Sequence, residues 1–563
     1  MQTLKMQTGW ESVVEALKAE KIKYVFGMPS SAKDLYDALY DEPDIKDILV
    51  RHEAAGGFMA MSYSLLTGDP AVCFTSQGPG ITNLTSAMLE ALATCAPVIA
   101  ICPGNDGHKY GKGTFQETDQ LAIMKPITKW AFRVEYAEKI PWAINRAFYL
   151  ATNGKPGPIY IEIPVEIGRN KFEIPEYSTA ARRIRMEGDP LSIEKASELL
   201  ISAKKPLIIS GGGAKHSGAY AEVKELAELL GAPIMTTPSG RGIITEDHPL
   251  SFGQVGLYRT RLGLQFNDET DLMITIGSRN EEFQTGAWKL RPSDCKLIQI
   301  DIDPFEINRN WIADVPIAGD AKLILKQLLK EVEKGKKQIW KDRYSEYATQ
   351  KHAYEIEVSK ECEPNETPIK SKKVVHHLNK IFGEDTIIVH ENGLQDTWSY
   401  YSPYYKVLDL NGTVAPGEQT CMGVGVMGAV GAKLAKPEKK VVCVTGDGAF
   451  QMYNQDVPTA VQYETAITWI ILNSYSLSWP KFGQKALGER YISTDFEAQP
   501  NFVQLAHSYG CYGELVEKPE DLDNALRRAL EANESGKSAI LDIVIDPFDV
   551  AEGFMEFQNL KKG

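Results

Sequence analysis

The feature that most constrains the fold is a pattern that recurs along the chain. Short runs rich in Val and Ile end in Gly, Pro or Asp and alternate with helical stretches, as in AVCFTSQGPG, APVIAICPGN and GPIYIEIPVEI. An uninterrupted apolar run of this length predicts a strand that is buried on both faces. Because such strands alternate with helices, the sequence predicts an α/β fold with a parallel sheet covered on both sides.

The same pattern restarts twice, which predicts three doubly wound domains. KKPLIISGGG and DLMITIGSR carry it in the middle third, and DTIIVHENG and KKVVCVTGDG carry it in the last third. The chain has 563 residues, which is too long for one hydrophobic core. Charged stretches near residues 166–190 and 333–367 are predicted linkers. The predicted domains are residues 1–180, 190–335 and 368–545, followed by a tail at 546–563.

Composition and charge exclude several classes of function. The net charge is −14 without a basic stripe, so nucleic acid and acidic membrane surfaces are not expected partners. No apolar stretch reaches the roughly 20 residues of a membrane span, and no secretory signal is expected at the N-terminus. Eight scattered cysteines without a C-x-x-C pair indicate reduced thiols. The sequence therefore predicts a cytoplasmic protein.

The stretch VVCVTGDGAFQMYNQ at residues 441–455 places Asp447 between two glycines, directly after a strand. Ser474 follows the next strand of the same third. Since strand ends one crossover apart can be neighbours in a parallel sheet, the Asp447 carboxylate, a side chain at 474 and a nearby backbone carbonyl can meet. Such oxygen ligands suit Mg²⁺, which proteins often share with a phosphate. A tight strand–helix turn without a ligand is the alternative.

A Gly-Asp-Gly turn that is followed, after the next strand, by Asn473-Ser474 resembles the signature of thiamine-diphosphate enzymes. The segment GAKLAKPEKKVVCVTGDGAFQMYNQDVPTAVQY and the later ILN are similar to the catalytic subunit of acetolactate synthase. The resemblance covers essentially the whole chain and implies a pyrimidine-binding, a central and a diphosphate-binding domain. It also implies that thiamine diphosphate and Mg²⁺ are the cofactors, and that the chain forms a homodimer or homotetramer with active sites at the subunit interface.

The resemblance assigns the metal and diphosphate residues of the last third. The implied metal ligands are Asp447, Ser474 and Ser476, and the implied diphosphate contacts are Gly393, Leu394, Gln395, Gly446, Gly448 and Ala449. Thr420 and Met422 would lie against the cofactor, where a bulky apolar side chain keeps it bent. The family has an asparagine ligand where this chain has Ser474, so either Ser474 or Asn473 fills that position.

A thiamine enzyme also needs a carboxylate that drives the aminopyrimidine ring to its imino tautomer, and a dry pocket favours this proton exchange. Glu53 stands at a strand end in DILVRHEAAGGFMAMSYS, which resembles the glutamate motif of the family. A helix-start glutamate favoured by the helix dipole is the alternative. Other segments of the first third match residues near the pyrimidine and the reactive carbon. These residues are Pro29, Ser30, Gly78, Asn83, Phe115 and Gln116.

The middle third resembles the FAD-carrying central domain of acetolactate synthase in ISGGGAKHSGA and IDIDPFEINRN. The stretch after Arg279 and the pair Tyr258-Arg259 depart from the flavin-binding form. Because related enzymes bind ADP or the nucleotide of coenzyme A in this crevice, or leave it empty, three alternatives stay open: FAD, ADP or CoA, and no ligand.

The implied activity is a carbon–carbon lyase or carboligase acting on a 2-oxo acid or a related carbonyl donor, with acetolactate-type carboligation as the first hypothesis. A 2-hydroxyacyl-CoA lyase is one alternative. Another is a sulfoacetaldehyde acetyltransferase, which the stretch SLSWPKFGQ resembles and which would leave Lys481 and Gln484 for a polar substrate. A scaffold protein without catalysis is disfavoured, because Glu53 and Asp447 are both present. The apolar tail is expected to form a lid or to pack on the surface.

Overall fold

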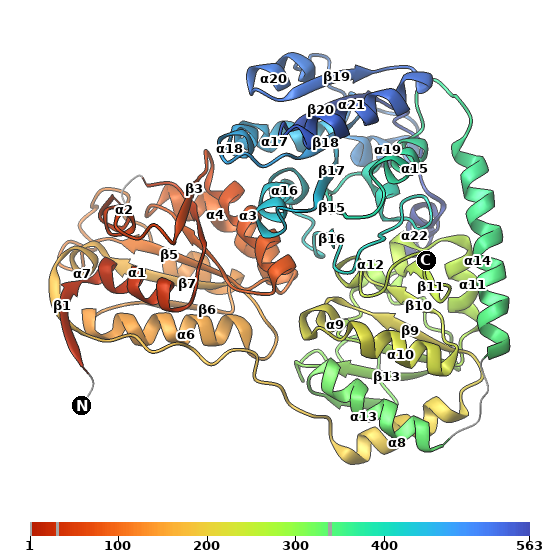
Figure 1. Cartoon of the computed structure of the whole chain (residues 1–563), viewed down its shortest axis with the longest axis horizontal. Helices are drawn as coiled ribbons and strands as arrows, with labels where there is room; N and C mark the ends of the chain where they lie inside the picture. Colours follow the sequence, from red (N-terminus) through yellow and green to blue (C-terminus); the bar gives the residue numbers. More distant parts are fainter. Residues whose placement is uncertain (1–2, 30–32, 336–340, 563) are drawn as a thin grey trace. The chain divides into compact units, whose positions relative to one another are not determined.

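The computed structural model describes residues 3–29, 33–335 and 341–562. The predicted fold class is confirmed: three six-stranded sheets follow one another along the chain, and all of their strands pair in parallel (Figure 1). Contacts divide the protein into two compact units. The first unit consists of Met1–Ile184, Gln419–Pro437 and Tyr453–Thr465, and the second of Arg185–Glu418, Glu438–Met452 and Ala466–Gly563.

The first sheet has the strand order β3-β2-β4-β5-β7-β6. Its strands are β2 (Tyr24–Gly27), β3 (Lys46–Leu49), β4 (Ala71–Phe74), β5 (Val98–Gly104), β6 (Trp130–Arg133) and β7 (Ile159–Pro164). Its helices are α1 (Gly9–Ala19), α2 (Lys33–Tyr40), α3 (Glu53–Thr67), α4 (Pro79–Ala93), α5 (Gln120–Met124), α6 (Ile140–Thr152) and α7 (Val165–Arg169). The central strands β4, β5 and β7 are buried along their whole length, as expected when helices cover both faces.

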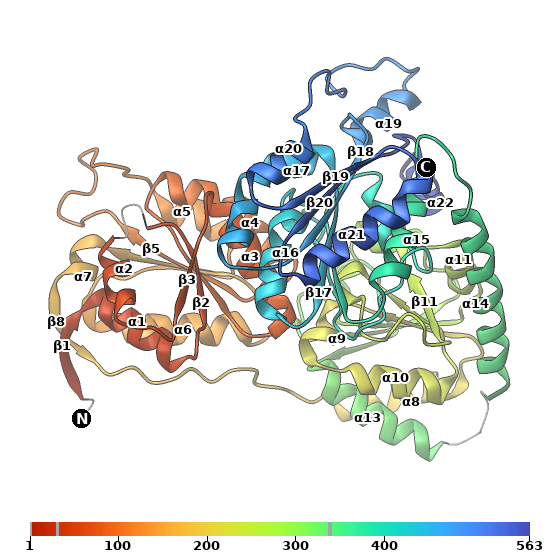
Figure 2. The ribbon, with the colours of Figure 1, turned by 45° about the horizontal axis from the view of Figure 1, so that its top comes forward.

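Helix α3 is buried on nearly every side and packs against a helix from much later in the sequence, α16 (Val424–Ala435), as Figures 1 and 2 show. Small residues make this close packing possible. A Cβ atom added at Gly431 would lie 2.0 Å from the carbonyl oxygen of Met59, so only glycine fits there. The 453–465 segment, with α18 (Val457–Gln462), is tied to the first unit by Arg51, whose backbone N–H donates to Asp456 at 2.7 Å.

The second unit holds the other two sheets. The middle sheet, in the order β11-β10-β9-β12-β13-β14, consists of β9 (Pro206–Ser210), β10 (Ile234–Thr236), β11 (Ser251–Gln254), β12 (Leu272–Ile276), β13 (Lys296–Asp301) and β14 (Val315–Ala318). Its helices are α8 (Pro190–Ser202), α9 (Gly212–Ser217), α10 (Tyr220–Leu230), α11 (Arg261–Glu269), α12 (Glu282–Thr285) and α13 (Ala321–Lys334). Helices α8, α10 and α13 pack together on one face (Figure 2).

The last sheet, in the order β16-β15-β17-β18-β20-β19, consists of β15 (Thr386–His390), β16 (Thr413–Val414), β17 (Lys440–Gly446), β18 (Thr468–Asn473), β19 (Tyr512–Val516) and β20 (Ala539–Val544). Its helices are α15 (Ser371–Phe382), α17 (Asp447–Tyr453), α19 (Ser478–Ala486), α20 (Phe502–Ser508), α21 (Leu522–Glu534) and α22 (Glu552–Lys562). Short 3-10 helices complete the fold: η2 (Lys125–Ile127), η3 (Ala137–Lys139), η4 (Pro238–Gly240), η5 (Gly256–Tyr258), η6 (Asp396–Tyr400), η7 (Asn454–Asp456) and η8 (Pro519–Asp521).

Both predicted linkers contain regular structure. In the first, β8 (Lys171–Pro175) pairs antiparallel with β1 (Leu4–Thr8). Most of the second forms the 22-residue helix α14 (Lys341–Cys362), which runs beside α11 in Figures 1 and 2. Val358 of α14 is fully buried, and Arg261 of α11 forms ion pairs of 2.8 Å with Glu357 and Glu361. The charged stretch is thus largely a helix that packs within the second unit.

A buried arginine of the middle domain contacts the last domain. The Arg241 guanidinium is fully buried and binds both carboxylate oxygens of Glu246 at 2.8 Å. It also donates to the backbone carbonyls of Ser399 and Tyr405, each at 2.7 Å. Because a buried guanidinium is stable only when its donors are satisfied, these contacts fix the two domains of the second unit to each other.

The C-terminal tail packs within the second unit. Phe554 and Phe557 of α22 are buried, and the rings of Phe554 and Trp479 lie 4.7 Å apart in an edge-to-face arrangement. Glu556 forms an ion pair of 2.9 Å with Arg259. The tail therefore adds to the core of this unit, and its role as a lid stays a prediction.

The eight cysteines, all within the described ranges, are free thiols, and six of them are buried. Burial raises the pKa of Cys73 to about 12, so this thiol stays protonated at neutral pH. Among the described residues, no helix combines the length and the apolar character that crossing a membrane requires.

Candidate active site

In the first unit, Glu53 begins helix α3 beside the glycine-rich start of α4. His52 caps α3, because its Nδ1 accepts the backbone N–H of Ala54 at 3.2 Å. The side-chain amide of Asn83 donates to Oε2 of Glu53 at 2.9 Å. The other carboxylate oxygen, Oε1, lies over Gly80, where an added Cβ would stand only 3.3 Å from it. The structure therefore brings Glu53, Asn83 and the Gly-Pro-Gly turn together.

Gln116 meets the same turn from the loop that follows β5. Gly78 has a φ of +61°, and a Cβ there would lie 2.7 Å from the carbonyl oxygen of Gln116, so glycine is needed on both counts. Gln116 itself has a φ of +56°, and its side-chain Oε1 is buried without a hydrogen-bond partner among the described residues. A strained backbone and an unpaired carbonyl are typical of a residue held for a ligand.

Gln120, which the sequence analysis did not identify, is hydrogen-bonded to the Gly-Pro-Gly turn. Its buried side chain accepts the backbone N–H of Gly78 at 2.8 Å and donates to the hydroxyl of Tyr160 at 3.0 Å and to the carbonyl of Pro103 at 3.2 Å. One amide thus joins the turn after β4 to residues of β5 and β7. No sequence motif marks Gln120, because its partners come from three separate parts of the chain.

The other predicted residues of the first unit are more exposed. Phe115 has 77% of its surface exposed, and Pro29 lies on the surface after β2. Ser30 lies outside the described residues. Thr420 and Met422 precede α16 and are half-buried, and Thr420 has a φ of +49°.

In the second unit, Asp447 lies at the end of β17 and is 1% exposed. Ser474, at the end of the neighbouring strand β18, donates to Oδ1 of Asp447 at 3.2 Å. The same hydroxyl lies 2.7 Å from the hydroxyl of Ser478 and 3.0 Å from the carbonyl oxygen of Ser476. Burial raises the pKa of Asp447 to about 6, against hydrogen bonds from Gln499 and Ser474 that lower it. The predicted meeting of Asp447, Ser474 and Ser476 thus occurs.

Asn473 is hydrogen-bonded to other residues than Asp447. Its side-chain amide donates to Oδ1 of Asp542 at 2.8 Å, and its side-chain carbonyl accepts the backbone N–H of Tyr475 at 3.1 Å. Both ends of the amide are therefore engaged. Of the two alternatives at this position, Ser474 is the side chain that lies beside Asp447.

The loop 393–396 contains an unexpected buried acid. Leu394 is buried in the core, and Gln395 donates to the carbonyl of Pro547 at 2.5 Å. Asp396 is 1% exposed, and neither of its oxygens has a hydrogen-bond partner among the described residues. A Cβ at Gly393 would lie 2.8 Å from Asp396 Oδ1, so the acid lies directly beneath the predicted diphosphate loop.

Burial raises the pKa of Asp396 to about 7, and the nearby backbone N–H groups of 396 and 397 lower it less. An unfolded Asp titrates near 3.9. Between about pH 4 and pH 7 the folded protein therefore binds the extra proton, and the free energy of unfolding falls as pH rises through this window. We expect the titration of Asp396 to lower the free energy of unfolding by roughly 2–4 kcal/mol between pH 4 and pH 8.

The Asp396→Asn variant removes this titration. Urea denaturation midpoints without cofactor at pH 5 and pH 8 will show a smaller loss of stability in the variant than in the wild type. Asp37→Asn, at an exposed position of α2, serves as a control and leaves the pH dependence unchanged. An Asp396→Asn variant whose pH dependence equals that of the wild type would refute the assignment.

The residues around Glu53 and the residues around Asp447 suit thiamine diphosphate and a divalent cation as ligands. Open space adjoins Gly446, where an added Cβ would meet no atom within 4 Å, so a ligand can approach the strand end beside Asp447. The donors there are a carboxylate, hydroxyls and a backbone carbonyl, all of them oxygens of the kind Mg²⁺ prefers. The described part of the chain contains no cluster of three or more His, Cys, Asp or Glu residues suited to a metal. An ion at Asp447 would thus depend on ligands from outside that residue set, such as phosphate.

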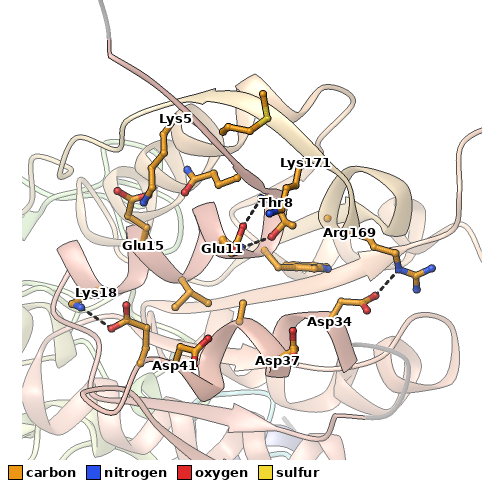
Figure 3. A pocket seen from close by; sticks show the side chains of 17 residues that line it. Lys5, Thr8, Glu11, Glu15, Lys18, Asp34, Asp37, Asp41, Arg169 and Lys171 are labelled. Atoms are coloured by element: carbon orange, nitrogen blue, oxygen red, sulfur yellow. Dashed lines mark hydrogen bonds and ion pairs between the residues drawn. The ribbon is translucent and has the colours of Figure 1, made fainter.

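A groove of about 580 Å³ on the first unit is a different feature (Figure 3). It is lined by residues of β1, α1, α2, α7 and the start of β8, and several of its charged side chains form ion pairs. Lys18 pairs with Glu42 at 2.7 Å and Arg169 with Asp34 at 2.9 Å. The groove contains none of the predicted site residues.

Comparison with known proteins decides the family. Three family models match the chain in order: the thiamine pyrophosphate enzyme N-terminal TPP binding domain at residues 7–123, the central domain at 193–328 and the C-terminal TPP binding domain at 397–543. A probable acetolactate synthase large subunit of Methanocaldococcus jannaschii is 35% identical over 96% of this chain and 92% of its own length. The chain belongs to the thiamine pyrophosphate enzymes.

Other relatives of this thiamine pyrophosphate enzyme carry similar names. A probable acetolactate synthase large subunit of Methanococcus aeolicus is 34% identical over 96% of this chain and 92% of its own length. The acetolactate synthase isozyme 3 large subunit of Escherichia coli is 29% identical over 99% of both chains. The protein is therefore an acetolactate synthase-like enzyme that depends on thiamine pyrophosphate, which is thiamine diphosphate, and its catalysis is of the carboligase or lyase type.

Proposed function

We propose that this enzyme is a Mg²⁺-dependent carboligase of the acetolactate synthase type, with a 2-oxo acid as the carbonyl donor. The single observation that carries the proposal is the buried Asp447 carboxylate at the end of β17, with Ser474 on one of its oxygens. A charge is costly at such a site unless a cation or a proton compensates it. The names of the relatives, which align over most of both chains, support acetolactate synthesis as the reaction.

When bound, the cofactor supplies a nucleophilic carbon that adds to the donor carbonyl and holds the electron pair when the adjacent bond breaks. The protein's part is to bind, orient and move protons. Asn83 holds Oε2 of Glu53, which leaves Oε1 over Gly80 to exchange a proton with the pyrimidine ring. Gln116, with its unpaired Oε1, would orient a polar group of the substrate or cofactor.

At the other end of the cofactor, Asp447, Ser474 and the Ser476 carbonyl would hold the Mg²⁺ ion against the diphosphate. Gly446, Gly448 and Ala449 allow a phosphate to approach the start of α17. We infer that Gly393, Leu394 and Gln395 bind the same diphosphate through their backbone, because the Leu394 side chain is buried and the Gln395 amide is engaged with Pro547.

In the central domain we propose FAD, ADP or CoA as the candidate ligand. The glycines of the turn after β9 have a structural reason of their own: a Cβ at Gly211 would lie 2.2 Å from the carbonyl oxygen of Gly277. The buried hydroxyls of Ser210 and Thr236 at the neighbouring strand ends have no partner among the described residues, which supports a ligand there.

The test is to identify what the purified protein carries and makes. Small molecules released by denaturation are analysed by absorption and mass spectrometry, and the native protein is incubated with pyruvate, thiamine diphosphate and Mg²⁺. We expect thiamine diphosphate among the released molecules, and acetolactate with release of CO₂ from pyruvate. Absence of thiamine diphosphate binding even in excess Mg²⁺ would refute the proposal.

The central-domain ligand separates the alternatives. A yellow flavin favours the acetolactate synthase type, whereas CoA or ADP with inactivity on pyruvate favours a 2-hydroxyacyl-CoA lyase. A sulfoacetaldehyde acetyltransferase would need phosphate as a second substrate. That alternative is weakened because Lys481 pairs with Asp495, and Gln484 binds the backbone of Ile492 at 2.8 and 2.9 Å. Neither side chain is free for a substrate in this structure.

We further propose that the enzyme is a homodimer or homotetramer with active sites at the subunit interface. Glu53 lies in the first unit of the chain and Asp447 in the second. In the family that the chain resembles, the corresponding residues of one active site come from different subunits, so two copies would complete two sites.

A further inference from the structure

Gln499 reaches the Asp447 carboxylate from a distant loop. Its side-chain Nε2 donates to Oδ2 of Asp447, the oxygen that Ser474 does not bind. The carboxylate is therefore enclosed between the Ser474 hydroxyl on one oxygen and the Gln499 amide on the other. No motif in the sequence indicates this contact, since the two residues are 52 positions apart.

The loop that carries Gln499 is fixed to the metal-site segment by backbone contacts. Ser476 and Asp495 form an antiparallel bridge, and the N–H of Leu477 donates to the carbonyl of Thr494 at 2.7 Å. The N–H of Phe496 donates to the carbonyl of Tyr475 at 2.9 Å. Gln499 thus follows directly from a strand-like segment that is paired with residues 475–477, so its position beside Asp447 is built into the fold.

The amide has an unused acceptor. Oε1 of Gln499 is buried and has no hydrogen-bond partner among the described residues. Rotation about the terminal amide torsion exchanges Oε1 with Nε2, and this torsion has a broad, roughly two-fold preference. Without a cation, the NH₂ group satisfies the carboxylate, and with a cation, the carbonyl oxygen can take its place.

The serine at position 474 explains why the cation would need an amide ligand from another part of the chain. The family that the chain resembles has an asparagine at this position, whereas here the side chain is a hydroxyl. Oδ1 of Asp447, the Ser476 carbonyl and the Ser478 hydroxyl all lie within hydrogen-bond distance of it. Asn473 cannot substitute, because both ends of its amide bind elsewhere. A side-chain carbonyl ligand is missing from residues 473–478, and Gln499 carries the amide that contacts the same carboxylate.

We propose that Gln499 is a further ligand of the divalent cation held by Asp447 and Ser474, and that its side-chain carbonyl supplies the amide oxygen that position 474 lacks. The inference rests on the proposed function insofar as it assumes a cation at Asp447. It assigns a metal-binding role to the loop between α19 and α20, which the comparison of motifs leaves without one.

The test measures metal binding directly. Mn²⁺ is titrated into the full-length protein with saturating thiamine diphosphate, and free Mn²⁺ is followed by electron paramagnetic resonance. Gln499→Ala is expected to weaken Mn²⁺ binding about 10- to 100-fold. Gln499→Glu, which keeps an oxygen ligand, is expected to bind Mn²⁺ at least as tightly as the wild type. Gln504→Ala, at an exposed position of α20, is the matched control and leaves the affinity unchanged.

A double variant separates ligation from simple support of the loop. If Gln499 compensates for Ser474, then Ser474→Asn combined with Gln499→Ala regains most of the lost affinity. Circular dichroism and the thermal midpoint check that the variants fold. If Gln499→Ala does not fold, the Mn²⁺ affinity of Gln499→Glu is compared with that of the wild type instead.

Two outcomes would overturn the inference. If Gln499→Ala binds Mn²⁺ as tightly as the wild type, or more tightly, the amide is only a donor that competes with the ion. If Gln499→Glu binds as weakly as Gln499→Ala, an oxygen at this position does not contact the metal. A wild-type protein that binds neither Mn²⁺ nor thiamine diphosphate would instead refute the proposed function.

Discussion

Replacing Glu53 by Gln is expected to lower turnover by about 10²- to 10⁴-fold while thiamine diphosphate still binds. The Gln side chain keeps the shape of Glu53 and a carbonyl oxygen for Asn83, which contacts Oε2 at 2.9 Å. It cannot take up and return a proton, so the pyrimidine ring loses its proton-exchange partner. The direct measurement is the rate at which the C2 hydrogen of the bound cofactor exchanges with deuterium, followed by NMR after acid quenching.

Two further observations make this result specific. Glu138→Gln, at an exposed position of η3, should exchange and turn over at the wild-type rate. Cofactor affinity, measured by quenching of tryptophan fluorescence, should change little in Glu53→Gln, because the variant loses a proton-transfer group and no binding contact of the diphosphate. Wild-type exchange and turnover in Glu53→Gln would show that Glu53 is only a helix-start residue.

The Asp447→Asn variant is expected to lose affinity for Mg²⁺ and, with it, affinity for thiamine diphosphate by at least about 100-fold. Asn keeps the size of the side chain but removes the charge that binds the cation. Burial already disfavours that charge, as the raised pKa of about 6 indicates, so the variant should be no less stable than the wild type in the absence of Mg²⁺. Isothermal titration calorimetry with thiamine diphosphate, at several Mg²⁺ concentrations, measures the loss.

Unchanged affinity in Asp447→Asn would refute the metal site. A lower thermal midpoint without Mg²⁺ would show that Asp447 is needed for folding.

The two inactive variants also test the shared active site. In a mixed dimer of Glu53→Gln and Asp447→Asn chains, one interface site contains both native residues, so mixing should restore part of the activity. Mixtures that stay inactive after exchange of subunits would place both residues of one site on one chain.

The sequence predicts the fold well because the pattern that encodes it is local. A fully apolar strand such as β4 or β5 is recognisable from its own residues, and the glycine turns that follow mark its end. The contacts of Asp447 with Ser474 were predictable for the same reason, since both follow neighbouring strands. Glu53 and Asn83 come together because each stands at or near the start of a helix on one edge of the sheet.

What the sequence could not reveal are contacts that depend on the tertiary fold. Gln120 bonds the turn after β4 and residues of β5 and β7. Gln499 reaches Asp447 only because the 494–496 segment pairs with residues 475–477. Asp396 reads as an ordinary polar loop residue, yet the fold buries it without a partner. The charged sequence of α14 also gives little sign of its narrow buried stripe, which includes Val358 and Cys362.

The packing of α16 on α3 also has a consequence for how the protein is made. The first unit includes residues up to Thr465, and the close contact between Gly431 and Met59 completes it. During synthesis from the N-terminus, the first 184 residues therefore emerge long before the helix that covers α3. Since newly made domains generally fold as soon as they are complete, this unit reaches its final packing only after most of the chain has left the ribosome. Until then, the apolar surface of α3 lacks the helix that buries it in the folded protein.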